Sequence, residues 1–193
     1  SVYVDDVAGA LSGTRHLLNL GHRRIAFLQA VGDSGFSFSS SERLLGYQQA
    51  LTEAGIPLDE DLVVTTPFPD KHGTARALGQ LLSLREPPTA VFAEHDEAAV
   101  ATIRALRAAQ IGVPEQMSVL GFDDHPVADL FDLSTVAQSP SDIGRTAGEL
   151  ALRLINDSDA DHAQHIVLPS HVIPRATTAP LLQPQSRGQE QTG

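Results

Sequence analysis

The sequence predicts an α/β fold built on parallel strands, because short apolar segments alternate with longer segments of helical periodicity along most of the chain. The apolar segments are continuous, which is typical of strands that are buried on both faces of a sheet. Strands joined through helices make right-handed crossovers, so we expect helices on both faces. The expected strands are residues 2–5, 24–29, 62–66, 90–94, 118–122, 135–138 and 166–172.

Helices are expected between these strands, and local stop signals mark several of their ends. Gly21 and Gly55 each follow a helical segment, and Pro87 and Pro88 follow a third. Glycine accepts the left-handed conformation that closes a helix, whereas proline cannot continue one. The expected helices are residues 8–20, 41–54, 71–85, 97–110 and 141–156. Residues 180–193 are polar and lack periodicity, so we expect a disordered tail there.

The charge and composition exclude several classes of partner. The chain carries 24 acidic and 13 basic residues, a net charge of −11, and its basic residues form no cluster larger than Arg23–Arg24. Nucleic-acid binding needs basic groups that neutralise phosphates, so the chain alone is not expected to bind DNA or RNA. No apolar run approaches the ~18 residues that a membrane span requires. Cysteine is absent, which excludes disulfides and thiolate metal sites.

Polar residues follow almost every predicted strand. They are Asp5–Asp6, Gln29, Glu94–Asp96, Asp123–Asp124 and Gln138. In parallel α/β sheets, ligands bind at the carboxyl ends of the strands. Carboxylates accept hydrogen bonds from two hydroxyls at once, and a guanidinium donates in a planar fork. The pattern therefore predicts a binding site for a polar small molecule.

Each of these residues also has a purely structural interpretation. Asp96 precedes a predicted helix, whose free N–H groups it can cap. Asp123 or Asp124 can stabilise the turn before Pro126. Arg43 lies near a helix start, where the helix dipole disfavours a cation, so it is either held there for a partner or faces solvent.

Catalytic and metal-binding patterns are weak. The sequence has no G-x-S-x-G elbow and no glycine-rich phosphate loop, so we expect neither a nucleophilic enzyme nor a bound cofactor. Phosphorylation of the Asp123–Asp124 pair with Mg²⁺ is an enzyme-class alternative, but the single lysine, Lys71, is not at a strand end. His162 and His165 have helical spacing in a segment that reads as a strand, so these residues and His171 predict no metal site.

Five motifs carry a resemblance to a known family. They are "LGHRRIAFL" (20–28), "ERLLGYQQAL" (42–51), "PPTAVFAEHDEAA" (87–99), "VPEQMSVLGFDD" (113–124) and "STVAQS" (134–139). In order and spacing they resemble the LacI/GalR family of bacterial transcription regulators over roughly residues 1–179. The resemblance implies a type I periplasmic-binding-protein-like fold of two Rossmann-like lobes, which are joined by crossing hinge strands.

The resemblance also implies a division of the chain. Residues 1–21 and 139–162 would be the remaining part of an incomplete N-lobe, and residues 22–138 and 163–179 would form the C-lobe. Hinge crossings are expected near residues 21–22 and 138–139. The helix-turn-helix that binds operator DNA in this family is expected to be missing from the chain.

The family pattern further implies a set of ligand-binding residues. They are Arg43, Asp123, His95, Gln138, Asp6 and Ser39. Arg43 and Asp123 match family positions that contact the effector, and Gln138 matches a glutamine near the hinge. Asp6 and His95 replace the asparagines usual in the family. The imidazole of His95 can donate or accept, depending on its protonation.

The expected function is therefore the sensing of a sugar or another small polar effector in a cytoplasmic, homodimeric transcription regulator. Operator DNA would be bound only through the helix-turn-helix. We expect no enzymatic activity, no cofactor and no membrane association. The alternative is a periplasmic or extracellular sugar-binding protein of a transport system, which shares the fold.

Overall fold

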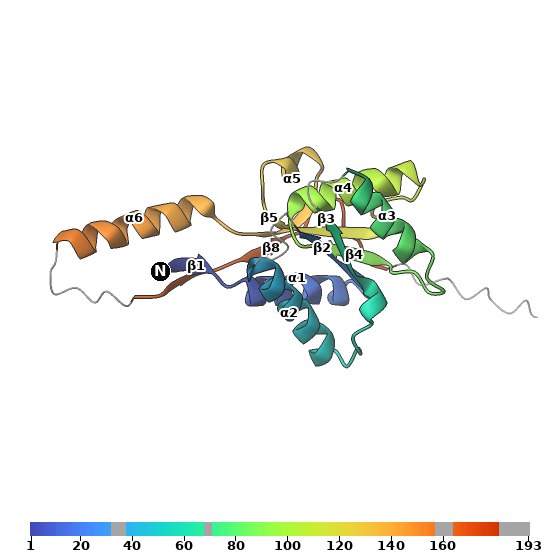
Figure 1. The fold of residues 1–193 in the computed structure, drawn as a ribbon, viewed down its shortest axis with the longest axis horizontal. Coiled ribbons are helices and arrows are strands. Elements are labelled where there is room, and N and C mark those ends of the chain that lie inside the picture. Colours follow the sequence, from blue (N-terminus) through green and yellow to red (C-terminus); the bar gives the residue numbers. More distant parts are fainter. Residues whose placement is uncertain (32–37, 68–70, 157–163, 182–193) are drawn as a thin grey trace, which may run out of the picture.

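The computed structural model describes residues 1–31, 38–67, 71–156 and 164–181, which form a larger and a smaller unit (Figure 1). The larger unit is a six-stranded sheet of order β3-β2-β4-β5-β6-β8 with its helices. Its strands are β2 (Ile25–Val31), β3 (Val63–Pro67), β4 (Ala90–Ala93), β5 (Ser118–Asp123), β6 (Ser134–Ala137) and β8 (His171–Ile173). Its helices are α1 (Asp6–Asn19), α2 (Phe38–Glu53), the short helix η1 (Glu60–Leu62), α3 (Lys71–Leu82), α4 (Asp96–Ala108) and α5 (Val127–Leu130).

The smaller unit pairs β1 (Val2–Val4) with β7 (Ile166–Leu168) in parallel, and α6 (Pro140–Asn156) lies beside them. The chain passes between the units after β1, between β6 and α6, and between β7 and β8.

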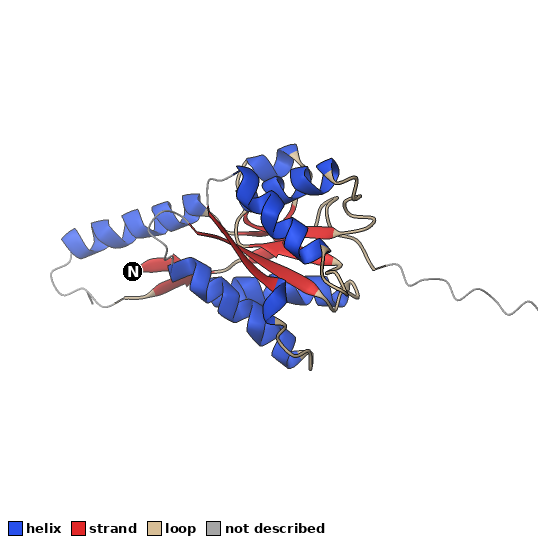
Figure 2. Ribbon diagram, turned by 45° about the vertical axis from the view of Figure 1, so that its right-hand side comes forward, coloured by secondary structure: helices blue, strands red, loops and turns tan. Residues whose placement is uncertain are grey.

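The predicted α/β fold is confirmed. Helices cover both sides of the large sheet (Figure 2). Successive side chains of β2 explain the continuous apolar runs, because Ala26 and Leu28 pack with α3 and α4 whereas Ile25 and Phe27 pack with α1 and α2. The strands pair in parallel except at β8, which runs antiparallel to β6. This strand enters the sheet from β7 without an intervening helix.

The prediction of a single strand over residues 166–172 is wrong. Pro169 and Ser170 separate β7 from β8, and the two strands belong to different sheets. Proline has no N–H to donate to a sheet ladder, so a strand is interrupted readily at this position.

The predicted lobe boundary after residue 21 is also corrected. Helix α1 packs on α2 and on strands β6 and β8, so it belongs to the larger unit. The approach of α1 to α2 is close, because a Cβ added at Gly46 would lie 2.2 Å from the carbonyl oxygen of Val7. Residues 21–22 therefore connect two elements of the larger unit, and the first crossing lies at Asp5, between β1 and α1. Asp5 caps α1 by accepting a 2.8 Å bond from the Ala8 N–H.

Two further predictions fall partly outside the described residues. Of the expected tail, Pro180 and Leu181 are described, and the Leu181 N–H donates to the Leu20 carbonyl at 2.8 Å; residues 182–193 lie outside. His162 also lies outside, and in the described part of the chain no three His, Cys, Asp or Glu side chains are grouped to hold a metal ion. None of the helices in the described ranges combines the length and the apolar character that a membrane crossing demands.

Candidate functional site

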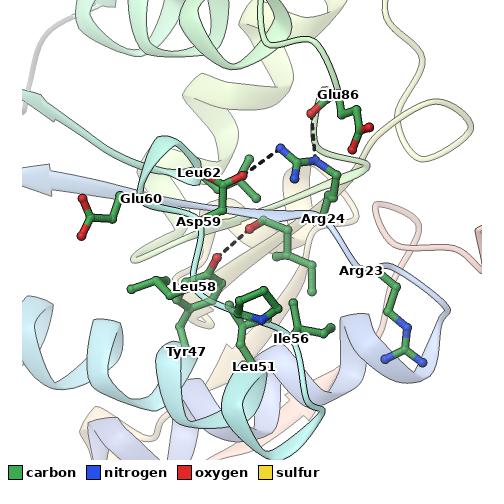
Figure 3. A pocket seen from close by; sticks show the side chains of 12 residues that line it. Arg23, Arg24, Tyr47, Leu51, Ile56, Leu58, Asp59, Glu60, Leu62 and Glu86 are labelled. Carbon is green, nitrogen blue, oxygen red and sulfur yellow. Dashed lines mark hydrogen bonds and ion pairs between the residues drawn. The ribbon is translucent and has the colours of Figure 1, made fainter.

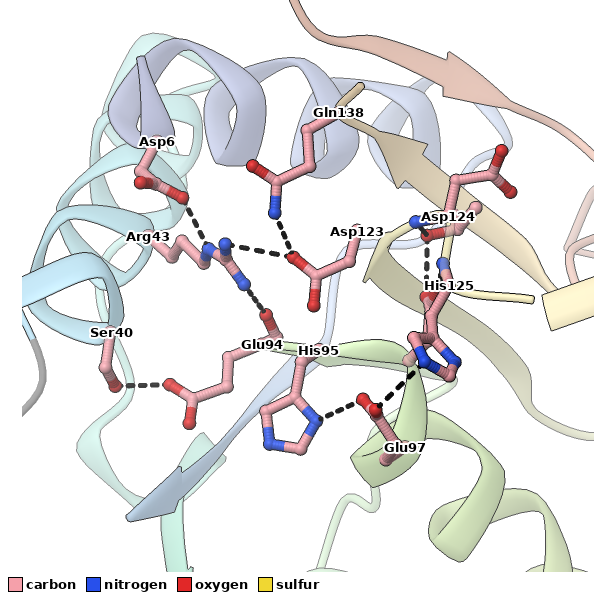
Figure 4. A network of polar contacts seen from close by, with 12 residues as sticks. Asp6, Ser40, Arg43, Glu94, His95, Glu97, Asp123, Asp124, His125 and Gln138 are labelled. Carbon is pink, nitrogen blue, oxygen red and sulfur yellow. Dashed lines mark hydrogen bonds and ion pairs between the residues drawn. The ribbon is translucent and has the colours of Figure 1, made fainter. Parts of the chain in front are cut away.

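Arg43 of α2 lies at the centre of a polar network at the carboxyl ends of the strands (Figure 4). Its Nε donates to Asp6 Oδ1 at 2.6 Å, one Nη donates to Asp123 Oδ1 at 3.1 Å, and the other Nη donates to the Glu94 carbonyl. The guanidinium carbon also lies 3.7 Å from the ring centroid of Phe122. Arg43 therefore joins α1, α2 and the ends of β4 and β5, and only 9% of its side chain is exposed.

Asp123 shares its Oδ1 atom between two donors. The second donor is the side-chain amide of Gln138, which lies just after β6 and reaches Asp123 Oδ1 at 2.6 Å. Burial raises the pKa of Asp123, while the nearby Arg43 charge and the Gln138 hydrogen bond act in the opposite direction. The structure thus brings four of the predicted residues, Arg43, Asp123, Gln138 and Asp6, into one network.

The backbone at the end of β5 separates the two neighbouring carboxylates. Asp123 has φ of +112° and Asp124 has φ of +57°, in the left-handed region that costs energy for residues other than glycine. Asp123 contacts Arg43, whereas Asp124 forms a 2.8 Å ion pair with Arg175. Backbone strain of this kind gathers at functional sites, because the surrounding structure has to hold it in place.

Asp96 is fully buried behind this network. Its carboxylate accepts a 2.6 Å bond from the Thr135 hydroxyl and a 2.7 Å bond from the His125 N–H. Burial raises the pKa of Asp96 to about 6, although both hydrogen bonds favour the charged form. A Cβ added at Gly121 would lie 2.2 Å from Asp96 Oδ1, so this strand position requires glycine.

His95 takes the capping role that the sequence suggested for Asp96. It is the N-cap of α4, and its Nδ1 accepts from the Ala98 N–H at 3.2 Å. The same Nδ1 lies 3.2 Å from Glu97 Oε2. Accepting from Ala98 requires a free lone pair on Nδ1, whereas an ion pair with Glu97 requires a proton there. The two contacts therefore favour different protonation states of the imidazole.

Sequence reasoning missed the pairing of Glu94 with Ser40. Glu94 is buried, and its carboxylate accepts from the Ser40 hydroxyl, which in turn accepts a 3.0 Å bond from the Gln29 side chain. Glu94 stands at a strand end and was recognisable there. Ser40 was not, because α2 begins three residues earlier than expected and Ser39, Ser40 and Ser41 look alike in the sequence. Ser39 is half-buried in the first turn of α2, whereas the contact with Glu94 is made by Ser40.

A hollow of about 550 Å³ lies at the opposite end of the sheet (Figure 3). It is bounded by the start of β2, by α2 and by residues 56–62. Tyr47 donates its hydroxyl to the Ile25 carbonyl at 2.8 Å, and Arg24 contacts Asp59 at 3.0 Å and the Glu86 carbonyl at 2.8 Å. The main polar groups of this hollow are thus already bonded to other protein groups, which favours a structural role for it over ligand binding.

Comparison with known proteins agrees with this architecture. The periplasmic binding protein-like domain family matches residues 14–178. The transcriptional regulator DegA of Bacillus subtilis is 40% identical over 186 residues, which cover 93% of this chain and 52% of that protein. The regulator CelR of Thermobifida fusca is 34% identical over 176 residues, covering 90% of this chain and 50% of that protein. The chain therefore belongs to the periplasmic binding protein-like domain family, in the form found in LacI-type transcriptional regulators.

Solved structures give the same result. A complex of the regulator CelR with cellobiose has a TM-score of 0.79 at 32% identity, covering 91% of this chain and 53% of that one. A LacI family regulator from Enterococcus faecium with bound ribose has a TM-score of 0.81 at 30% identity, and the match covers 94% of this chain and 66% of that one. The chain spans about half the length of the curated relatives it matches. These relatives are named as transcriptional regulators, which removes support from the phosphoryl-transfer alternative.

Proposed function

We propose that this chain senses a small polar effector, of the sugar class or similar, for a LacI-type transcriptional regulator. The observation that carries the proposal is the network of Arg43, Asp123 and Gln138 at the carboxyl ends of the strands. Ligands of parallel α/β sheets bind at this edge. The relatives crystallised with cellobiose and ribose support a sugar or sugar-like effector.

Each residue of the network has a distinct part in this proposal. Asp123 accepts hydrogen bonds from the effector, and Arg43 holds Asp123 in position from the opposite side. Gln138 stands in the connection between β6 and α6, so a ligand beside it is next to a crossing between the two units. We also propose that the effector contacts three further predicted residues, which are His95, Asp6 and Ser39.

The effector would act by favouring one arrangement of the two units. It can shift their equilibrium only by its difference in affinity for the two arrangements. Operator binding through a helix-turn-helix, assembly as a homodimer and a cytoplasmic location belong to the proposal for the whole regulator. The names of the relatives favour a regulator over the transport-protein alternative.

The test is a thermal melt of the chain with a panel of sugars, sugar derivatives and nucleosides. A ligand at a hundred times its Kd adds about 2.7 kcal/mol to the free energy of unfolding, which raises Tm by about 5–11 °C for a chain of this size. Asp123→Asn should abolish the shift. Asp61→Asn, an exposed position in η1, should leave it unchanged. A shift that survives Asp123→Asn, or a cooperative melt that no ligand moves, would contradict the proposal.

A further inference from the structure

The residues after β8 run along the amino edge of the large sheet, opposite the candidate functional site. This segment, the C-terminal strap, comprises residues 176–181. Thr177 of the strap accepts from the Val119 N–H at 2.7 Å with its carbonyl, and it donates its hydroxyl to the Val119 carbonyl at 2.7 Å. Because β6 begins only at Ser134, opposite Leu120, Thr177 takes the place beside Val119 that a longer β6 would fill. The strap therefore completes the hydrogen bonding of β5 at its start.

Two histidines contact the strap. His16, in the last turn of α1, places its Nε2 3.1 Å from the Thr178 hydroxyl. His22, which precedes β2, places its Nε2 3.1 Å from the Ala179 carbonyl. A carbonyl oxygen only accepts, so Nε2 of the neutral His22 ring carries the proton and Nδ1 accepts from the Thr89 hydroxyl at 2.9 Å. His22 is only 2% exposed, so its contacts are shielded from water.

The hydrogen-bond partners of the two rings are neutral hydroxyl and carbonyl groups. They belong to Thr89, Ser118, Thr178 and Ala179. The charged residues closest to these groups along the chain are Arg15, Arg23, Arg24, Glu86, Glu115, Asp132 and Arg175. Arg15, Arg24 and Arg175 pair with carboxylates elsewhere, and the other four residues are exposed. Among the residues that the structure describes, neither histidine forms an ion pair with a carboxylate.

A positive charge on either ring would therefore be poorly compensated. Burial lowers the pKa of His16. Burial also lowers the pKa of His22, where the Ala179 carbonyl opposes the shift and a charge on His16 adds to it. A proton added to His22 would sit on Nδ1, so the Thr89 hydroxyl could no longer donate there. Water would solvate both charged rings in an open strap, so acid favours opening.

We propose that His16 and His22 form a pH-sensitive latch, which holds the strap against the sheet while the rings are neutral and releases it when they are protonated. The opening is local, because β5 and β6 pair with each other through residues that the strap does not join. The stabilisation from the neutral rings is present above about pH 6.5 and is lost as the pH falls through the lowered pKa values of the folded state. The latch does not depend on the proposed effector site, which lies at the opposite edge of the sheet.

The test is amide hydrogen exchange of the chain at pH 7.5 and 5.5, expressed as protection factors so that the intrinsic pH dependence of exchange is removed. The reporters are the amides of Val119, Ala179 and Leu181, whose hydrogen bonds join the strap to the rest of the chain. The amides of α4 are the internal reference.

Two variants separate the latch from other effects of acid. In the double variant His16→Gln, His22→Gln, neither side chain titrates, and each amide N–H can still donate to the strap. The matched control is His72→Gln, which removes an exposed histidine in the first turn of α3.

Protection at the three reporters should fall at least about threefold from pH 7.5 to 5.5, because two titrating groups act on one opening equilibrium. The amides of α4 should not share this fall. The double variant should lose most of the pH dependence at the reporters, and His72→Gln should keep it. The proposal is overturned by protection that does not fall, by a fall that α4 shares equally, or by a fall that persists in the double variant.

A titration of the imidazole signals by NMR decides the proposal if the double variant does not fold. The pKa values of His16 and His22 should lie below 6.5, and the loss of protection at the reporter amides should follow the same titration. A pKa of 6.5 or higher for His22 would show that the closed strap accepts the charge, and the proposal would fail. It would also fail if protection changed over a pH range in which neither ring titrates.

Discussion

The two ends of the large sheet hold the same kind of contact in different surroundings. At the carboxyl end, Arg43 bonds to two carboxylates and a carbonyl with 9% of its side chain exposed. At the amino end, Arg24 bonds to one carboxylate and a carbonyl with 32% exposed. Burial makes the difference, because a buried ion pair cannot lose one partner without stranding the other, whereas an exposed pair can. Loss of one partner should therefore destabilise the fold strongly at the carboxyl end of the sheet and only weakly at the amino end.

The largest expected effect comes from removing each arginine in turn. Arg43→Leu leaves Asp6 and Asp123 without their cation and should lower the free energy of unfolding by about 3–5 kcal/mol. Arg24→Gln should lower it by less than about 1 kcal/mol. Urea denaturation of both variants measures the difference, and equal losses would refute the contrast between the two ends.

The pH dependence of stability offers a second test at the carboxyl end. The pKa of Asp96 is raised from 3.8 to about 6, so the folded state holds this proton more tightly than the unfolded chain does. The resulting stabilisation is fully present below about pH 4 and is lost as the pH rises through 6, a change of about 3 kcal/mol. Urea denaturation at pH 4.5 and 7.5 should show about 2 kcal/mol of this loss in the chain and a clearly smaller loss in Asp96→Asn. Asp59→Asn, at the amino end, is the control and should keep the loss.

Alanine substitutions at two glycines should change the free energy of unfolding by smaller amounts and in opposite directions. Gly121→Ala forces a Cβ against Asp96 and Leu133 and should cost about 1–3 kcal/mol of unfolding free energy. Gly79→Ala, inside α3 with nothing within 4 Å of the added Cβ, should stabilise by about 0.5–1 kcal/mol. Thermal melts compare the two variants. Stabilisation by Gly121→Ala would mean that the Asp96 carboxylate is free to move away.

A further small effect is expected at the amino end. Tyr47→Phe removes the hydroxyl that donates to the Ile25 carbonyl and should cost about 1 kcal/mol. Because the Tyr47 hydroxyl bonds to the Ile25 carbonyl at the start of β2 and to none of the network residues, effector affinity should not change. Calorimetry with the ligand identified in the panel checks this, and a changed affinity would show that the two ends are coupled.

The sequence predicted the place of the carboxyl-end network better than its detailed contacts. The alternation of strands and helices is local, and it was enough to place Asp123, Gln138 and Asp6 at one edge of a sheet. The match of Ser40 with Glu94 depends on the exact start of α2, which no local signal marked. The packing of α1 on the larger unit is a tertiary property, so the lobe boundary could not be derived from the residues of α1 alone. The break between β7 and β8 did have a signal, Pro169, which the apolar pattern around it concealed.

The opposite pairing of Asp123 and Asp124 links the proposed effector site to β8, the strand that follows a crossing between the units. One peptide bond joins the two residues, yet Asp123 faces the Arg43 network and Asp124 holds Arg175, two residues after β8. A ligand that fixes Asp123 should therefore slow the deuterium exchange of the amides of residues 171–173 and 175, although none of these residues belongs to the proposed site. Thermodynamic reciprocity requires the converse, so that loosening the crossing strand by Arg175→Gln should change the affinity for the effector. Ligand affinity and the mobility of a strand outside the site would then be two measurements of the same free energy.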